Sequence, residues 1–211
     1  VSGLRPTFGR VSRHGAMALS WSMDKAGPIA RSALECALVF DFIRGSDGLD
    51  PTVIDAAFHA SETMDVSRLR VGFIPAFFEA DYPGKDLDVK VLEDLRSMGI
   101  DLKTADWPFE LPVNALRIIL SAEAAAAFDH LTISGRDSML VAQRVNSWPN
   151  IFRTSRFIPA VEYINANRIR ARLIEQLHEW FKDYDVVVTP SYGGNQLLLT
   201  NLTGHPCMVV P

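Results

Sequence analysis

Residues 69–75 read Leu-Arg-Val-Gly-Phe-Ile-Pro, a short apolar run that is typical of a strand. A helical pattern follows at about 86–98 and ends at Gly99, and a second short strand is expected at about 100–105. When a strand, a helix and a strand follow one another with short links, the connection is right-handed and the strands are parallel. This stretch therefore predicts a parallel β-α-β unit.

Helices and short apolar strands also alternate on both sides of this unit. The apolar spacing predicts further helices at residues 28–44, 51–64, 115–131 and 158–182. Pro28 suits the first turn of the first of these, and Asp50 is the expected N-cap of the second. The apolar runs at 185–190 and 207–210 predict two more strands, of which the first reads as a buried central strand. The alternation indicates the α/β class.

The composition is that of a globular protein and excludes several functional classes. Of the 211 residues, 48% are hydrophobic and 22% are charged, and the formal net charge is −4. A mildly acidic chain without a basic block is a poor stand-alone nucleic-acid binder. No apolar run reaches the roughly 18 residues that span a bilayer, and no leader is recognisable, so we expect no membrane association and no export.

The cysteines and histidines indicate neither a disulfide framework nor a metal site. Cys36 and Cys207 lie far apart in apolar runs, so we expect both to be reduced and buried, which favours a cytoplasmic setting. The five histidines lack the spacing of metal ligands. No glycine-rich phosphate loop is present either, so no cofactor is expected.

The sharpest local motif, Ser22-Met23-Asp24-Lys25, fits the Ser-x-x-Lys nucleophile pattern of penicillin-binding enzymes. That chemistry needs the serine at the start of a helix, whereas Gly27-Pro28 follows at once here. We therefore expect a loop with a capping serine and a solvated lysine. The small-residue run at 122–127 is interpreted as a helix-packing surface. No nucleophile, base and orienting group can be assembled from the residue pattern alone.

A longer motif does carry information about function. Residues 3–13 read Gly-Leu-Arg-Pro-Thr-Phe-Gly-Arg-Val-Ser-Arg, and residues 22–31 read Ser-Met-Asp-Lys-Ala-Gly-Pro-Ile-Ala-Arg. Both resemble the amidase signature family, which runs Gly-x-Lys-Pro-Thr-x-Gly-Arg-Val-Ser-Arg and then Ser-Leu-Asp-x-x-Gly-Pro-x-x-Arg. Arg5 and Met23 are mild departures from this pattern.

The resemblance continues downstream, in Leu69–Gly72, in the Tyr- and Arg-bearing helix at 162–170, in the strand at 184–190 and in Asn-Leu-Thr-Gly-His-Pro at 201–206. It implies a mixed β-sheet flanked by helices on both faces. It assigns no catalytic, cofactor-binding or metal-binding residue to this chain. The matched family-motif residues are expected to be structural: Gly3, Pro6, Thr7, Gly9, Arg10, Ser12, Asp24, Gly27, Pro28, Arg31, Thr203, Gly204 and Pro206.

The resemblance implies hydrolysis of a carboxylic amide by a serine nucleophile, a second serine in a cis peptide and a lysine base. In the family these three residues precede the first motif, so Ser20, Ser22 and Lys25 do not match them. Residues 1–211 are therefore expected to be a partial amidase domain, truncated at both ends and inactive alone.

Two other functions remain open. One is an amidotransferase A-type subunit that forms glutaminyl- or asparaginyl-tRNA with partner subunits, and the other is a non-catalytic α/β binding or scaffold protein. A small amide is the expected ligand, and a homo-oligomer is possible. Substrate choice is expected to lie at about 106–158, where four aromatic residues could line an apolar pocket or belong to the core: Trp107, Phe109, Trp148 and Phe152.

Overall fold

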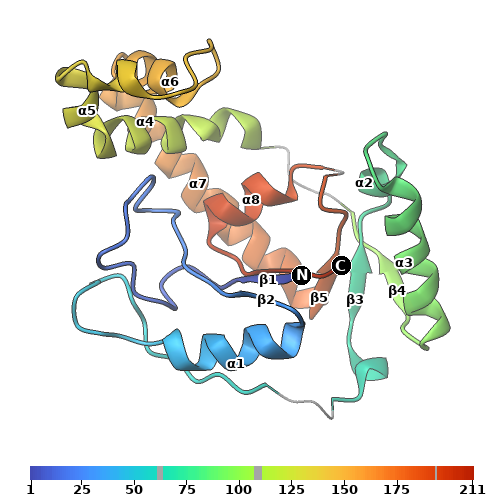
Figure 1. Cartoon of the computed structure of the whole chain (residues 1–211). Coiled ribbons are helices and arrows are strands. Elements are labelled where there is room, and N and C mark those ends of the chain that lie inside the picture. Colours follow the sequence, from blue (N-terminus) through green and yellow to red (C-terminus); the bar gives the residue numbers. More distant parts are fainter. Residues whose placement is uncertain (61–63, 107–110, 193) are drawn as a thin grey trace.

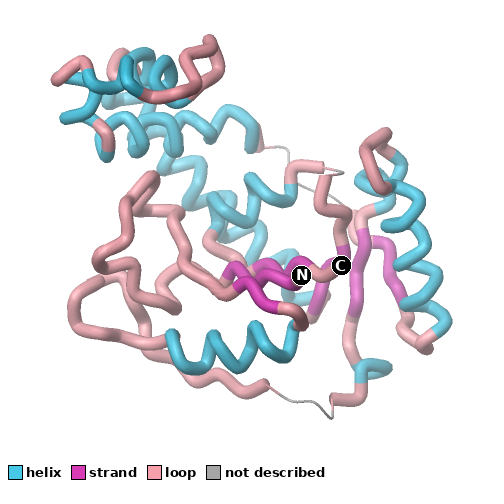
Figure 2. The backbone as a smooth tube through the Cα atoms, viewed as in Figure 1, coloured by secondary structure: helices cyan, strands magenta, loops and turns pink. Residues whose placement is uncertain are grey.

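The computed structural model describes residues 1–60, 64–106, 111–192 and 194–211. Helices pack around two small sheets, which confirms the α/β class (Figures 1 and 2). The strands are β1 (Ser2–Arg5), β2 (Ile29–Ala30), β3 (Val71–Phe73), β4 (Leu102–Thr104), β5 (Val186–Val188) and β6 (Cys207–Val209). The helices are α1 (Ala33–Ile43), α2 (Pro75–Glu79), α3 (Lys85–Ser97), α4 (Arg117–Ala127), α5 (Asp129–Ile133), α6 (Trp148–Ser155), α7 (Ala160–Trp180) and α8 (Gln196–Thr203).

The predicted β-α-β unit is confirmed by the first sheet, whose order is β4-β3-β5. Val71 of β3 lies opposite Leu102 of β4 and Val186 of β5, and both pairings are parallel. Between β3 and β4 the chain forms α2 and α3, and Figure 1 shows α3 alongside β4 at the edge of the molecule. Gly99 follows α3 with a φ of +85°, a conformation that glycine adopts without a steric penalty.

The second sheet is antiparallel and joins the two ends of the chain. Its order is β2-β1-β6, and Gly3 of β1 lies opposite Ile29 on one side and Val209 on the other. The two termini consequently lie close together in the middle of Figure 1. Among the described residues the strands thus form one parallel and one antiparallel sheet.

The hydrophobic core lies between α4, α7 and α8. Leucine and isoleucine side chains from these helices are almost fully buried there, including Ile119, Leu173, Leu177, Leu199 and Leu202. Met23, from the N-terminal loop, also belongs to this cluster. No helix within the described ranges is long and apolar enough to cross a membrane.

The helix predicted over 28–44 begins later than expected. Residues 29–30 form β2, and α1 starts at Ala33 because Ser32 is the N-cap, accepting a hydrogen bond from the Glu35 amide at 3.2 Å. Pro28 is therefore not in the first turn. Its carbonyl oxygen accepts a hydrogen bond from the Leu4 amide at 2.9 Å, which draws this segment toward β1.

The helix predicted over 51–64 is wrong for residues 51–60, which contain only a turn, and residues 61–63 lie outside the described ranges. Asp50 does accept a hydrogen bond from the amide two residues on, but its carboxylate also binds Arg13. Ile54 donates its amide to Gly9 at 2.8 Å. Because the Ile54 amide binds a distant segment, it is not available to a helix.

Three further predictions need correction. The helix expected over 115–131 is interrupted at Phe128, between α4 and α5. The strand expected at the centre of the sheet, β5, lies at its edge, and Val186 is 45% exposed. Both cysteines are free, but only Cys36 is fully buried, whereas Cys207 is half-buried.

Candidate functional site

The C-terminal end of α8 is where the segments with the family motifs meet. Gly204 ends the helix in the left-handed conformation, with a φ of +81°. Its carbonyl oxygen accepts a hydrogen bond from the Phe8 amide at 2.9 Å. Thr203 is buried and donates its hydroxyl to the Leu199 carbonyl at 2.9 Å. The motif at 201–206 thus closes α8 and holds the N-terminal loop against it.

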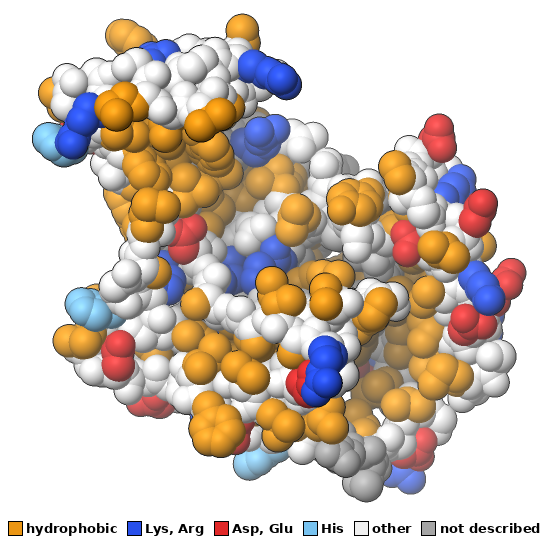
Figure 3. Space-filling view, in the orientation of Figure 1, with side chains coloured by type: hydrophobic (Ala, Val, Ile, Leu, Met, Phe, Trp, Pro, Cys, Tyr) orange, Lys and Arg blue, Asp and Glu red, His pale blue; other side chains and the backbone are white. Residues whose placement is uncertain are grey.

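Basic side chains gather at this end of α8. Arg5 donates to the hydroxyl of Thr200, and Lys25 donates to the carbonyl oxygen and side-chain oxygen of Asn201, at 3.4 and 3.3 Å. The last carbonyl groups of a helix carry a partial negative charge, which cations stabilise. Figure 3 shows Lys and Arg side chains at the floor of the hollow in the middle of the molecule.

Arg170, on α7, links the same helix end to the N-terminal loop. Its Nε donates to the Leu202 carbonyl, and its two terminal nitrogens donate to the hydroxyl and carbonyl oxygens of Ser22, at 2.7 and 2.8 Å. Burial lowers the pKa of the Arg170 guanidinium, and the nearby carboxylate of Glu123 opposes that shift. One side chain therefore fixes three segments to each other.

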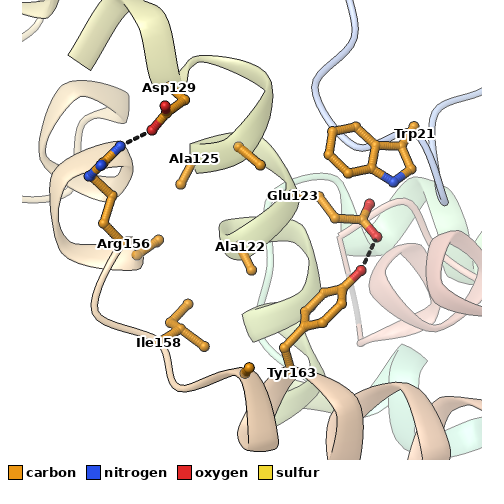
Figure 4. A pocket seen from close by; sticks show the side chains of 11 residues that line it. Trp21, Ala122, Glu123, Ala125, Asp129, Arg156, Ile158 and Tyr163 are labelled. Carbon is orange, nitrogen blue, oxygen red and sulfur yellow. Dashed lines mark hydrogen bonds and ion pairs between the residues drawn. The ribbon is translucent and has the colours of Figure 1, made fainter. Parts of the chain in front are cut away.

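Glu123, on α4, is the buried acid of this region, with only 2% of its surface exposed. Oε2 accepts hydrogen bonds from the Ser20 hydroxyl and, at 3.3 Å, from the Ser22 amide. Oε1 accepts a hydrogen bond from the Tyr163 hydroxyl at 2.9 Å (Figure 4). Burial and the hydrogen bond to Glu123 raise the pKa of Tyr163, so the phenol stays protonated and donates.

We call this set of connected polar groups the polar junction. It consists of Arg5, Ser20, Ser22, Lys25, Glu123, Tyr163 and Arg170 with the α8 residues 200–202. Burial of such groups is favourable only when each finds a partner, and removal of one partner leaves the others unsatisfied.

The lysine of the Ser-x-x-Lys motif belongs to the junction, so the prediction of a solvated lysine is wrong. Lys25 also donates to the Met23 carbonyl at 2.7 Å. Burial, with the neighbouring charges of Arg5 and Arg170, lowers the pKa of Lys25 to about 8. Neither Ser20 nor Ser22 is a hydrogen-bond partner of Lys25 in the described part of the chain. No Ser–Lys pair is therefore assembled there.

Two motif glycines lie where the backbone leaves no room for a side chain. A Cβ atom on Gly27 would be 2.0 Å from the Leu4 carbonyl oxygen and 2.6 Å from Pro6. A Cβ atom on Gly9 would be 2.6 Å from the Thr52 carbonyl oxygen, and Gly9 also has a φ of +77°. Both glycines allow distant backbone segments to approach each other closely.

Other motif residues make side-chain contacts with the backbone. Arg10 donates to the Ala56 carbonyl at 2.8 Å, and Asp24 accepts hydrogen bonds from the amides of Leu19 and Ser20, at 2.8 and 2.9 Å. Arg31 forms an exposed ion pair with Glu35. The remaining matched residues lie in or beside these segments: Gly3, Thr7, Ser12, Pro28 and Pro206.

A pocket of about 440 Å³ opens beside the polar junction. Its walls come from the N-terminal loop, from α4 and α5, from the end of α6 and from the start of α7. Figure 4 shows the indole of Trp21 across from Glu123, with Tyr163 below and the ion pair of Asp129 and Arg156 on the far side. The volume falls in the range of about 300–1,000 Å³ that is typical of small-molecule sites.

Of the four aromatic residues that could line a pocket or belong to the core, Trp148 and Phe152 do not line this pocket. Trp107 and Phe109 fall outside the described residues. Phe152 stacks between Phe128 and Trp148, with ring centroids 4.9 and 5.6 Å apart, where α6 packs on α4. We call these three rings the aromatic stack. The run at 122–127 packs against other helices, as expected, but Ala122 and Ala126 also line the pocket.

Sequence patterns did not reveal Trp21 and Glu123 as site residues. One signal was available for Glu123, because it is the single charge within the small-residue run 122–127 of a helix. Trp21 gave no such signal, since its role depends on the tertiary position of an irregular loop. Across the described ranges, no group of three or more His, Cys, Asp or Glu side chains could hold a metal ion.

Comparisons with known proteins identify the family. The A subunit of the glutamyl-tRNA(Gln) amidotransferase of Streptomyces coelicolor is 31% identical over 221 aligned positions, which cover 90% of this chain and 44% of that protein. The A subunit of the corresponding Thermus thermophilus amidotransferase is 30% identical, with 90% and 45% covered. The chain therefore spans about half the length of the curated relatives it matches.

The fold is shared with solved structures. The A subunit of the glutamyl-tRNA(Gln) amidotransferase of Thermotoga maritima has a TM-score of 0.74 at 22% identity, and the match covers 100% of this chain and 50% of that one. A vestigial protein complex, described as revealing the origins of an s-triazine catabolic enzyme, has a TM-score of 0.80 at 24% identity, with 99% and 50% covered. The family model named Amidase matches residues 1–209. The chain therefore belongs to the amidase family.

Proposed function

We propose that residues 1–211 are part of an amidase domain that hydrolyses a carboxylic amide to an acid and ammonia or an amine. In this proposal a serine outside these residues attacks the amide carbonyl, the C–N bond breaks, and water releases the acid from the acyl-enzyme. The observation that carries the proposal is the family match over residues 1–209.

The polar junction supports placing the catalytic groups outside this chain. The hydroxyls of Ser20 and Ser22 and the amine of Lys25 are each bound to other partners, so they do not form a nucleophile and base. In this proposal the junction fixes the N-terminal loop that lies beneath the nucleophile segment, and it leaves the chemistry to residues beyond the chain.

The surface of α1 supports the view that the domain extends further. Cys36 and Phe40 lie on the buried side of this helix. Leu38 and Phe42 lie on other sides, and their surfaces are 56% and 90% exposed. Large apolar side chains that gather on the exposed sides of a helix are normally covered by another element. Residues 1–211 alone are therefore expected to aggregate or to bind a hydrophobic dye, and a clean monomer with a sharp cooperative melt would contradict this part of the proposal.

The activity is tested by comparing residues 1–211 with the intact natural protein that contains them. Ammonia release from a panel of simple amides is measured, together with labelling by a fluorophosphonate that reacts with activated serines. The intact protein should release ammonia and be labelled, whereas residues 1–211 should do neither. Labelling of Ser20 or Ser22 would overturn the assignment of the nucleophile.

The names of the relatives support a second candidate, an amidotransferase A-type subunit. The two curated relatives described above, from Streptomyces coelicolor and Thermus thermophilus, are both A subunits of glutamyl-tRNA(Gln) amidotransferases. This function requires partner subunits, so co-purification with them and ammonia transfer to aminoacyl-tRNA would favour it. A protein that binds amides without hydrolysis would instead fit the scaffold alternative. The unpaired cysteines support a cytoplasmic setting for any of the three.

A further inference from the structure

The pocket beside the polar junction has one apolar wall and one polar end. The apolar wall combines the face of the Trp21 indole, which is about half exposed, with Ala122, Ala126 and Ile158. Figure 4 shows Trp21, Ala122 and Ile158 around one space beside α4. Flat aromatic groups gain most from such a wall, because stacking adds to the burial of apolar area.

The polar end is the carboxylate of Glu123. A carboxylate accepts about four hydrogen bonds. Ser20, Ser22 and Tyr163 donate three hydrogen bonds to Glu123. The bonds from Ser20 and Ser22 are made to Oε2, and the bond from Tyr163 is made to Oε1. Oε1 therefore keeps capacity for one more donor, such as the N–H group of an amide.

The charges around the pocket disfavour an anionic ligand. Glu123 and Asp129 are acidic, and the basic lining residue, Arg156, is already paired with Asp129. The cations of the polar junction, Arg170 and Lys25, are held by oxygen partners on α8 and on the N-terminal loop, and they are not among the lining residues. An added carboxylate would lie close to the carboxylate of Glu123, and the two like charges would repel each other.

We propose that this pocket binds neutral amides with an aromatic or small apolar body, and that Trp21 and Ala126 determine which bodies fit. The ligand ring lies against Trp21, and an N–H group faces Glu123. This inference rests on the proposed function for its place in catalysis, but binding itself can be measured without turnover. It favours a hydrolase of apolar amides over a site for zwitterionic glutamine.

The test is direct binding of three probes, benzamide, benzoate and glutamine, to the intact natural protein by calorimetry. Benzamide should bind at least tenfold more tightly than benzoate or glutamine. Ala126→Phe fills the pocket from an exposed position and should weaken benzamide binding at least tenfold. The matched control is Ala127→Phe, which is the next residue of α4, is also exposed and does not line the pocket. It should bind benzamide as the unaltered protein does.

A further variant, Trp21→Ala, removes the aromatic wall and should weaken benzamide binding about fivefold, which keeps the test decisive if Ala126→Phe unfolds. Equal binding by Ala126→Phe and Ala127→Phe, or benzoate binding as tightly as benzamide, overturns the inference. If benzamide binds as expected but the intact protein releases no ammonia, the proposed function fails and the pocket stands. If ammonia is released with the same KM in Ala126→Phe and Ala127→Phe, the pocket fails and the function stands.

Discussion

α4 contacts the rest of the molecule through two regions, the polar junction and the aromatic stack, and the contacts in the two regions differ in kind. On one side, Glu123 joins the polar junction through hydrogen bonds to defined atoms of Ser20, Ser22 and Tyr163. On the other side, Phe128 follows the helix and stacks on Phe152 in the aromatic stack. Hydrogen bonds require particular atoms at particular distances, whereas apolar contacts require mainly volume and shape.

The difference bears on the family motifs. The motif segments at 3–31 and 201–206 supply several members of the polar junction, and their contacts depend on particular atoms. The region around the aromatic stack, within 106–158, supplies most of the pocket walls. A region that tolerates substitution can change the shape of a pocket without loss of the fold.

The largest expected effect breaks the polar side of this comparison at Glu123. Glu123→Leu leaves two hydroxyls and one amide without their acceptor and leaves Arg170 without a nearby opposite charge. Removal of one partner from such a buried set costs about 3–5 kcal/mol, so the free energy of unfolding in urea should fall by about that amount. Glu175→Gln, on the exposed face of α7, is the control and should change it by less than about 0.5 kcal/mol. A small loss at Glu123 would show that water replaces the missing acceptor.

A somewhat smaller effect is expected from the close backbone approach at Gly27. Gly27→Ala places a methyl group 2.0 Å from the Leu4 carbonyl oxygen, and relief of that overlap should cost about 3 kcal/mol. The matched control is Gly3→Ala, where the nearest atom lies at 3.8 Å. Thermal unfolding followed by circular dichroism should separate the two variants clearly. Equal melting temperatures would mean that β1 and this loop shift apart freely.

A pair of conservative substitutions compares the two sides directly. Arg170→Lys keeps the charge but cannot reproduce the planar set of hydrogen bonds, and should cost about 2 kcal/mol. Phe152→Leu keeps much of the apolar volume in the aromatic stack and should cost about 1 kcal/mol. The free energy of unfolding of both variants is measured by urea denaturation, and the curves are fitted with the same dependence of that free energy on urea concentration. If the order is reversed, geometry matters more in the aromatic stack than in the polar junction.

The smallest effect concerns the pH dependence that Lys25 gives to the polar junction. The folded pKa of Lys25 is about 8, and the unfolded pKa is about 10.4, so the unfolded state binds more protons between these values. Below pH 8 the folded protein carries the full cost of burying the charged amine. As the pH rises from 8 toward 10.4 the buried amine loses its proton, that cost disappears, and the free energy of unfolding increases. Because Lys25 is only half-buried, solvent screening limits the gain to about 1 kcal/mol or less.

This pH effect is measured as the difference in unfolding free energy between the unaltered protein and Lys25→Met from pH 7.5 to 10.5. The unaltered protein should gain stability relative to the variant across that interval. Lys103→Met, at an exposed position of β4, controls for the loss of a lysine. A flat difference curve for Lys25→Met would place the amine in a more solvated position.

Sequence patterns predicted best the elements whose signals are local. The β-α-β unit of β3, α3 and β4 and the long helix α7 were recognisable because apolar spacing and a stop at Gly99 determine them. The helix expected after Asp50 failed because the Asp50 carboxylate binds Arg13 and the Ile54 amide binds the Gly9 carbonyl, and both partners are far away in the sequence. Local propensity cannot anticipate such contacts.

The candidate site was predictable only in part, for a related reason. The motif residues were found as a family pattern, and the structure places Gly9, Gly27 and Gly204 at positions that require glycine. The pocket was not predicted, because it combines a loop residue, Trp21, with helix residues about a hundred positions later. Its polar end depends on the burial of Glu123, which charge patterning alone would assign to solvent.

The pairing of β1 with β6 has a consequence for the order of folding during synthesis. Gly3 and Val209 are opposite each other in the antiparallel sheet, so about two hundred residues must be made between the two strands. At about 5–20 residues per second, a ribosome needs about 10 to 40 seconds for that interval. During this time β1 has only the short strand β2 as a neighbour, and its other edge can pair with foreign strands. Chaperone protection of the nascent segment that carries β1 should therefore affect the yield of folded protein more than its final stability.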